Sequence, residues 1–235
     1  MPSDDIPIDF QWISIPASEF LMGAGDEQHV VNLPAYRIAR CPVTNAQYKQ
    51  YVDSTGCELP EHWEDGRIPK GKEQHPVVFV SWRDAMAFSE WADVSLPTEA
   101  QWEKAARGVD GRTYPWGETE PTTDLCSFSS NDTTPVGAFS PQGDSPYGLV
   151  DVAGNVWEWT TSLWGGDPFD AQFVYPYDAT DGREDLTASN SVFRVLRGGA
   201  FNHFQSKMLH CTRRRGWLPQ PRNQYVGFRV VCYEA

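Results

Sequence analysis

The sequence contains five cysteines and five histidines, the side chains that most often serve as nucleophiles, general bases or metal ligands. The cysteines are scattered, with no Cys-x-x-Cys pair and no metal-ligand spacing among them: Cys41, Cys57, Cys126, Cys211 and Cys232. An odd number of cysteines without a secretory signal indicates reduced thiols. His75, His203 and His210 stand in no recognisable arrangement with a Ser or Cys and an acid. Nucleophilic catalysis is therefore not predicted from these residues.

The carboxyl-terminal segment concentrates chemically versatile side chains between two strand-like ends. Residues 192–196 and 226–233 are rich in β-branched and aromatic residues, as strands require. Gly198 and Gly199 suit a bulge or a close backbone approach that a side chain would block. Residues 197–229 include seven Lys or Arg and no Asp or Glu. A polar insert held at both ends by a sheet is a common location for binding or chemistry.

Short strands and three helices are predicted to position this insert. Strands are expected at 10–15, 19–22 and 35–38, separated by Pro and Gly turns. Each predicted helix follows a polar N-cap residue. The first runs from about Asn45 to Asp53, after Thr44 and before Gly56, and the second follows Ser81. The third begins after Thr98, with Gln101 completing a capping box, and ends before Gly108. Loops and short strands are expected beyond residue 117.

Composition favours an irregular α+β fold and argues against two classes of partner. Of 235 residues, 40% are hydrophobic and 13% aromatic, which suffices for a sizeable core in one domain. The net charge of −13 argues against nucleic acid or a membrane surface, and a local basic excess does not offset it. No apolar run of 18 residues occurs, and the first six residues do not resemble a signal peptide. No membrane segment is expected, and a cytoplasmic location is the default.

Seven motifs occur in a fixed order and cover nearly the whole chain: Pro42-Val-Thr-Asn45, Pro76-Val-Val-Phe-Val-Ser-Trp82, Leu96-Pro-Thr-Glu-Ala-Gln-Trp-Glu103, Tyr114-Pro-Trp-Gly117, Gly148-Leu-Val-Asp-Val-Ala-Gly-Asn-Val-Trp-Glu-Trp159, Arg197-Gly-Gly199 and Gly227-Phe-Arg229. The series resembles the formylglycine-generating enzyme family, also called the sulfatase-modifying-factor family. The resemblance implies a C-type-lectin-like α+β fold over residues 1–235, with low regular secondary structure, irregular β-sheets and about three short helices.

The resemblance also implies a chemistry that this sequence departs from. Enzymes of the family oxidise a substrate cysteine to formylglycine with a pair of cysteines and bound copper. At those two positions this chain has His203 and Met208, and Cys211 lies three positions out of register. Copper(I) in such a site requires two thiolates, and a His/Met pair offers no thiol for exchange with a substrate. We therefore expect no enzymatic oxidation and no copper.

A calcium site of the family maps onto this sequence in part. The resemblance places its ligands at Asp151, Gly154, Val156 and Glu158. Two carboxylates and two backbone carbonyls are hard oxygen ligands that suit calcium, so calcium is expected as a cofactor. The alternative is that the neighbouring tryptophans, Trp157 and Trp159, are core residues and that the glutamate is merely hydrogen-bonded.

The insert resembles the variable region of target proteins of diversity-generating retroelements, here at about 197–231. Frame residues that fit the family recur through it: Arg197, Gly198, Gly199, Leu209, Arg214, Pro219, Arg222, Gly227, Phe228 and Arg229. Between them lie fourteen candidate ligand-binding residues of mixed chemistry: Asn202, His203, Phe204, Ser206, Lys207, His210, Arg213, Arg215, Trp217, Leu218, Gln220, Asn223, Gln224 and Tyr225. Large side chains with a polar group are typical of binding hot spots.

Strand alternation distinguishes the three consecutive arginines. In an extended chain the outer two point one way and the middle one the other. Arg214 is therefore predicted to serve the scaffold, while Arg213 and Arg215 face a ligand. The alternative for the aromatic residues is that Trp217 and Phe204 belong to the core.

Taken together, these features predict a non-catalytic protein that binds a macromolecular ligand, most simply another protein, through residues 202–225. Two alternatives stay open. One is an oxidase of the formylglycine-generating type in which Cys211 acts with another group. The other is an orphan regulatory or adaptor domain of the same fold without diversification.

Overall fold

The computed structural model describes residues 8–233, and within this range an early strand pairs with the last one. Strands β1 (Trp12–Ile15), β4 (Tyr36–Ala39) and β9 (Val231–Cys232) form an antiparallel sheet in the order β1-β4-β9. Strand β4 therefore lies between the first and last strands of the described chain and joins them into one sheet. Residues 1–6, which were predicted not to form a signal peptide, lie outside the described range.

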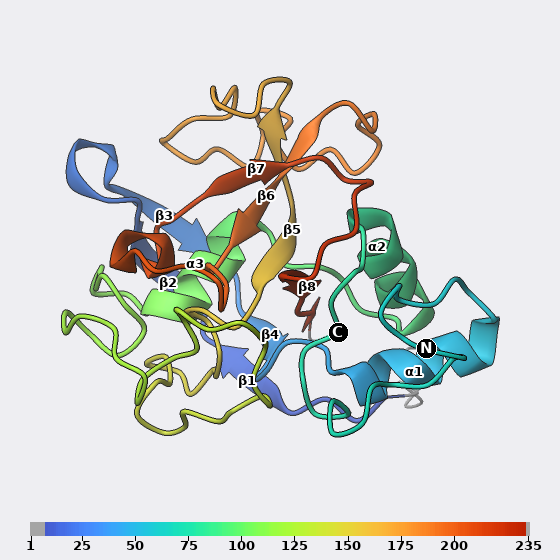
Figure 1. The fold of residues 1–235 in the computed structure, drawn as a ribbon. Helices are drawn as coiled ribbons and strands as arrows, with labels where there is room; N and C mark the ends of the chain where they lie inside the picture. Colours follow the sequence, from blue (N-terminus) through green and yellow to red (C-terminus); the bar gives the residue numbers. More distant parts are fainter. Residues whose placement is uncertain (1–7, 234–235) are drawn as a thin grey trace.

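A four-stranded sheet at the centre holds both ends of the predicted insert (Figure 1). Its order is β7 (Arg215–Trp217), β6 (Phe193–Arg197), β5 (Trp157–Gly165) and β8 (Val226–Phe228). Strand β5 is antiparallel to β6 and parallel to β8. The predicted strand at the start of the insert is confirmed as β6. The strand predicted over 226–233 is divided between β8 in this sheet and β9 in the β1-β4-β9 sheet. Strand β5 was not predicted, because it is buried on both faces and lacks the alternation of a half-buried strand.

The remaining strands form a hairpin. Strand β2 (Ser18–Met22) pairs antiparallel with β3 (His29–Leu33), with a 3-10 turn (Gly25–Glu27) between them. A second 3-10 turn, Ser206–Leu209, lies inside the insert. Strand β3 was not predicted, since two adjacent valines hide its alternation in the sequence. In the structure Val31 is buried and Val30 is 58% exposed.

All three predicted helices are confirmed, and their N-terminal signals act as expected. Helices α1 (Asn45–Thr55), α2 (Trp82–Trp91) and α3 (Glu99–Arg107) each begin with a capping box, in which the cap side chain and the third helical residue satisfy each other's backbone amides. Helix α1 ends at Gly56 in a left-handed conformation. Every residue of α3 is buried, including its charged ones. Such a helix requires ionic partners from the surrounding segments.

Tryptophans dominate the core. Trp82, Trp102, Trp157 and Trp159 are among the largest fully buried side chains. The alternative interpretation of the Gly148–Trp159 motif, in which its tryptophans are core residues, is therefore confirmed for that pair. The result is the α+β, C-type-lectin-like fold that the sequence predicts, with short helices and several small sheets. None of the helices in residues 8–233 has the length and apolar character needed to cross a membrane.

Candidate functional site: the carboxyl-terminal surface

The backbone of the insert is fixed by amides from other parts of the chain. These amides donate to four carbonyls of the insert: Ser129 to His203 (2.7 Å), Trp82 to Pro219 (2.9 Å), Phe79 to Asn223 (2.8 Å) and Trp157 to Tyr225 (2.9 Å). Backbone hydrogen bonds do not depend on the identity of the side chain that the residue carries. The path of the insert is therefore largely independent of its outward side chains.

Four frame arginines strengthen this attachment through buried or partly buried ion pairs. Each reaches a carboxylate in another element: Arg197 to Glu103, Arg214 to Glu99 (2.6 Å), Arg222 to Asp84 (2.9 Å) and Arg229 to Glu158 (2.6 Å). A buried charge is tolerated only when it is paired, so these contacts fix the register of the segment. The predicted scaffold role of Arg214 is confirmed.

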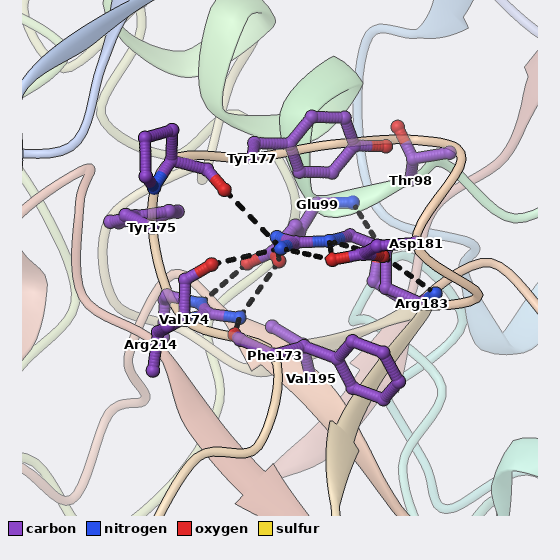
Figure 2. Close-up of polar contacts among 12 residues, drawn as sticks. Thr98, Glu99, Phe173, Val174, Tyr175, Tyr177, Asp181, Arg183, Val195 and Arg214 are labelled. Carbon is purple, nitrogen blue, oxygen red and sulfur yellow. Dashed lines mark hydrogen bonds and ion pairs between the residues drawn. The ribbon is translucent and has the colours of Figure 1, made fainter.

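Glu99, the first residue of α3, joins the insert to a second surface segment (Figure 2). Its carboxylate accepts two hydrogen bonds from Arg214, at 2.6 and 2.8 Å. Arg183, from the loop of residues 166–192, lies 3.5 Å from the same carboxylate and also pairs with Asp181 at 2.8 Å. Arg214 in turn donates to the carbonyl of Phe173, at 2.8 Å. One buried carboxylate therefore positions both the insert and the loop beside it.

The close approach predicted at the start of the insert is confirmed at Gly199. Its φ of +75° is unfavourable for other residues, and a Cβ atom there would lie 2.6 Å from the carbonyl oxygen of Met208. The glycine lets the 3-10 turn lie directly against the backbone that follows β6.

The fourteen candidate binding residues and the frame residues differ in exposure. None of the fourteen is fully buried, whereas eight of the ten frame residues are buried and only Arg214 and Arg222 are partly exposed. Phe204 is 77% exposed, so the alternative that places it in the core is wrong. Trp217 belongs partly to the core and partly to the surface. It packs against the core and lies edge-on to the ring of Tyr225, with ring centroids 6.3 Å apart.

A pocket of about 480 Å³ opens between the insert and the neighbouring loop. Four predicted residues line it: Arg213, Arg215, Trp217 and Leu218. Several lining residues were not among the predicted binding residues: Phe169, Phe193, Met208 and Pro221. The one available signal for Phe169 was an aromatic residue within a stretch rich in Gly, Pro and Asp, and this pattern alone does not say which surface the loop approaches.

Three other candidates line separate hollows instead of meeting in this pocket. Lys207 and His210 border a hollow of about 360 Å³ beside Tyr175. Gln224 borders another, of about 240 Å³, together with His62. The candidate residues therefore do not all meet in a single pocket.

The electrostatics of this face are set by Arg213 and Arg215. Neither has a carboxylate within 4.0 Å among the residues that the structure describes. The guanidinium of Arg215 lies over the ring of Trp217, 4.6 Å from its centroid. His203 Nε2 accepts a hydrogen bond from Trp157 Nε1 at 2.9 Å. Burial, then the charges of Arg215 and Arg213, lower the pKa of His203 to about 4, so this histidine is neutral at pH 7.

The residues at the oxidase positions do not fit a copper site. Copper(I) there would need two thiolates, but His203 uses Nε2 for the indole contact and Met208 lines the pocket. Cys211 is fully buried, and burial raises the pKa of its thiol to about 12. A thiol that is protonated and inaccessible is a poor nucleophile and a poor metal ligand.

The two carboxylates of the predicted calcium site already have partners within the protein. Both carboxylate oxygens of Glu158 accept hydrogen bonds from Arg229, at 2.6 and 2.7 Å, and one also accepts from Trp102. Asp151 accepts instead from the amide of Gly137, at 2.6 Å. The arrangement does not fit calcium, because Glu158 is already neutralised by an arginine. Calcium binding stays a prediction that would require this ion pair to open.

The capped helices, the four-stranded sheet and the buried arginine–carboxylate pairs define a formylglycine-generating-enzyme-type scaffold. Residues 9–233 match the sulfatase-modifying factor enzyme 1-like domain, and the chain belongs to this family. It is 31% identical to the formylglycine-generating enzyme of Thermomonospora curvata, over 94% of this chain and 92% of that protein.

Other relatives extend the comparison beyond enzymes of that name. The chain is 35% identical to the serine/threonine-protein kinase Pkn1 of Chlamydia trachomatis over 96% of its own residues, yet spans only 38% of the length of that protein. The structure of Treponema denticola variable protein 1 superposes with a TM-score of 0.73 at 23% identity, covering 97% of this chain and 96% of that one. At this identity the likeness shows the shared fold.

Proposed function

We propose that this protein is a non-catalytic recognition protein that presents residues 202–225 to a protein partner, as the variable protein of a diversity-generating retroelement. The observation that carries the proposal is that different groups of the insert hold its backbone and form its surface. Backbone carbonyls and frame arginines hold its path, while the fourteen intervening side chains are all at least partly exposed. A segment built in this way can change its surface chemistry without losing its fold.

The composition of the surface supports a protein partner. Trp217, Tyr225 and Arg215 combine large area with a polar group, as binding hot spots do. The overall charge of −13 disfavours nucleic acid. The whole-length similarity in fold to a protein named as variable in Treponema denticola supports the same use of the scaffold.

The environment of Cys211 supports the absence of oxidase chemistry. The thiol is enclosed, and neither His203 nor Met208 can replace a cysteine in thiol–disulfide exchange. A copper(I) titration gives a direct check, since stoichiometric binding that is lost in Cys211→Ser would favour the oxidase instead.

The DNA that flanks the gene tests the proposal. We expect a reverse-transcriptase gene and an adenine-rich near-copy of codons 197–229 nearby. If both are absent, the retroelement assignment is wrong. Recognition itself is tested by alanine substitutions at Trp217, Tyr225 and Arg215, which should weaken binding to a captured partner, whereas Lys70→Ala, at an exposed site outside the insert, should not.

A regulatory or adaptor domain is the second candidate function, favoured by one observation. The similarity to Pkn1 covers a minor part of a protein named as a kinase. Such a domain would have the same exposed face but no template copy of its codons. The flanking DNA therefore separates the two candidates.

A further inference from the structure

The pocket beside the insert has walls of two chemical kinds. Phe169, Phe193 and Leu218 contribute apolar surface, and Arg213 with Arg215 contributes cations. No Asp or Glu is among its lining residues. Its volume of about 480 Å³ lies in the range of pockets that enclose small molecules or large side chains.

The two arginines differ from most others in the chain, which lie within 4 Å of a carboxylate: Arg40, Arg107, Arg112, Arg183, Arg197, Arg214, Arg222 and Arg229. Arg215 has no such partner among residues 8–233; its guanidinium is partly buried and lines the same pocket as Arg213, whose like charge disfavours it. An anionic group in the pocket would offset both the cost of burying Arg215 and the repulsion between the two cations.

Phe169, from the neighbouring loop, also lines the pocket and is held away from the core. Its side chain is 96% exposed. Its amide donates to Asp167 Oδ1 at 2.8 Å, and Trp164 Nε1 donates to the carbonyl of Asp167 at 2.9 Å, so the turn is fixed by local hydrogen bonds. Asp167 and Asp170 flank Phe169, but neither lines the pocket. An apolar group placed against this ring would remove its surface from water.

We infer that the pocket binds a large apolar side chain of a protein partner whose neighbouring residues carry carboxylates. The apolar side chain packs between Phe169 and Leu218, and the carboxylates pair with Arg213 and Arg215. The inference rests on the proposed recognition function and specifies the ligand chemistry of that surface. Because the rest of the chain is strongly acidic, the short-range arginine contacts must supply the attraction that an acidic partner needs.

Free octapeptides passed over the immobilised full-length protein in surface plasmon resonance test this inference. The panel varies a central Phe, Leu or Ser and the flanking residues Glu, Gln or Lys. We expect the Glu-flanked Phe and Leu peptides to bind, and their Gln-flanked counterparts to bind at least about tenfold more weakly. The Ser-centred peptides should lose a similar factor.

Variants of the protein test whether the arginines cause the preference for Glu and whether Phe169 causes the preference for Phe. Arg213→Gln with Arg215→Gln should remove the advantage of Glu over Gln, and Phe169→Ser should reduce the advantage of Phe over Ser. Lys70→Gln, at an exposed site outside the pocket, should change neither. Each variant is first checked for an unchanged melting temperature, and Arg213→Gln alone serves if the double variant is destabilised.

The outcomes separate this inference from the proposed function. Equal binding of Glu- and Gln-flanked peptides, or a preference for Lys, would overturn the acidic-partner inference and leave recognition by the surface intact. A dimer that Phe169→Ser dissociates would assign the pocket to a second copy of the chain and overturn it as well. If no peptide binds and substitutions at Trp217 do not affect partner capture, both proposals fail.

Discussion

At the scale of single residues, the three consecutive arginines show how adjacent identical side chains acquire different roles. Arg214 is drawn inward to Glu99 by two hydrogen bonds, whereas Arg213 is exposed and Arg215 rests on Trp217. The alternation was predictable, because an extended chain sends successive side chains to opposite sides. The identity of the partner carboxylate was not, since Glu99 lies more than a hundred residues earlier in the chain.

Replacing the middle arginine should therefore destabilise the protein far more than replacing its neighbour. We expect Arg214→Met to lower the free energy of unfolding by about 3 kcal/mol, because it removes one partner of a buried carboxylate. Arg213→Met should change it by less than about 0.5 kcal/mol, as is usual for an unpaired surface side chain. Urea denaturation of both variants measures the difference, and equal effects would contradict the assigned roles.

His203 should make stability dependent on pH. Burial and two arginines lower its pKa to about 4 in the folded protein, below the usual value near 6.5. Between these values the unfolded chain binds a proton that the folded protein does not, so this residue's contribution to stability falls as the pH is lowered from about 6.5 to 4.

The variant His203→Gln isolates this contribution. Glutamine can accept from Trp157 Nε1 but does not titrate, so urea midpoints should fall less between pH 6.5 and 4 than those of the unmodified protein. The comparison is necessary because burial also lowers the pKa of His62 to about 4 and raises that of Asp151 to about 6. Because its pKa is raised, the Asp151 carboxyl makes stability increase as the pH is lowered over roughly pH 6 to 4, opposite to the effect of the histidines. Identical pH profiles for the two proteins would contradict the assignment.

At the scale of elements, the structure separates what local sequence determines from what it does not. The helices α1, α2 and α3 were predictable because a capping box satisfies backbone amides with residues three apart. The central strand β5 and the short strand β7 were not, because each becomes a strand only through a partner distant in sequence. The turn that presents Phe169 is local, but the surface it faces depends on the arginine network around Glu99.

The connection between β6 and the insert depends on Gly199. Alanine at this position would place a Cβ atom 2.6 Å from the Met208 carbonyl oxygen while adopting a φ of +75°. We expect Gly199→Ala to lower the free energy of unfolding by about 2 kcal/mol or more. Gly166→Ala is the matched control, because a Cβ atom there would have no neighbour within 4 Å and its φ is not in the left-handed region. A difference of less than about 0.5 kcal/mol between the two variants in urea would contradict the close approach.

At the scale of the whole molecule, the exposed part of the insert should tolerate wholesale replacement. Five of its side chains are exposed and make no side-chain hydrogen bond to another described residue: Asn202, Phe204, Lys207, Gln220 and Gln224. Changing all five to serine should alter the free energy of unfolding by no more than about 1–2 kcal/mol, since each surface substitution contributes little. Thermal melting followed by circular dichroism tests this, and loss of cooperative folding would show that these side chains belong to the scaffold.

The four carbonyls that anchor the insert limit the kind of change that it can accept. Each must meet an amide at a set position, and Pro219, Asn223 and Tyr225 are separated by only a few residues. An added or deleted residue between them would displace every later anchor by roughly 3 Å or more. Natural forms of this protein should therefore differ by substitution at constant length, so that a diverse population would share one spacing from Arg197 to Arg229.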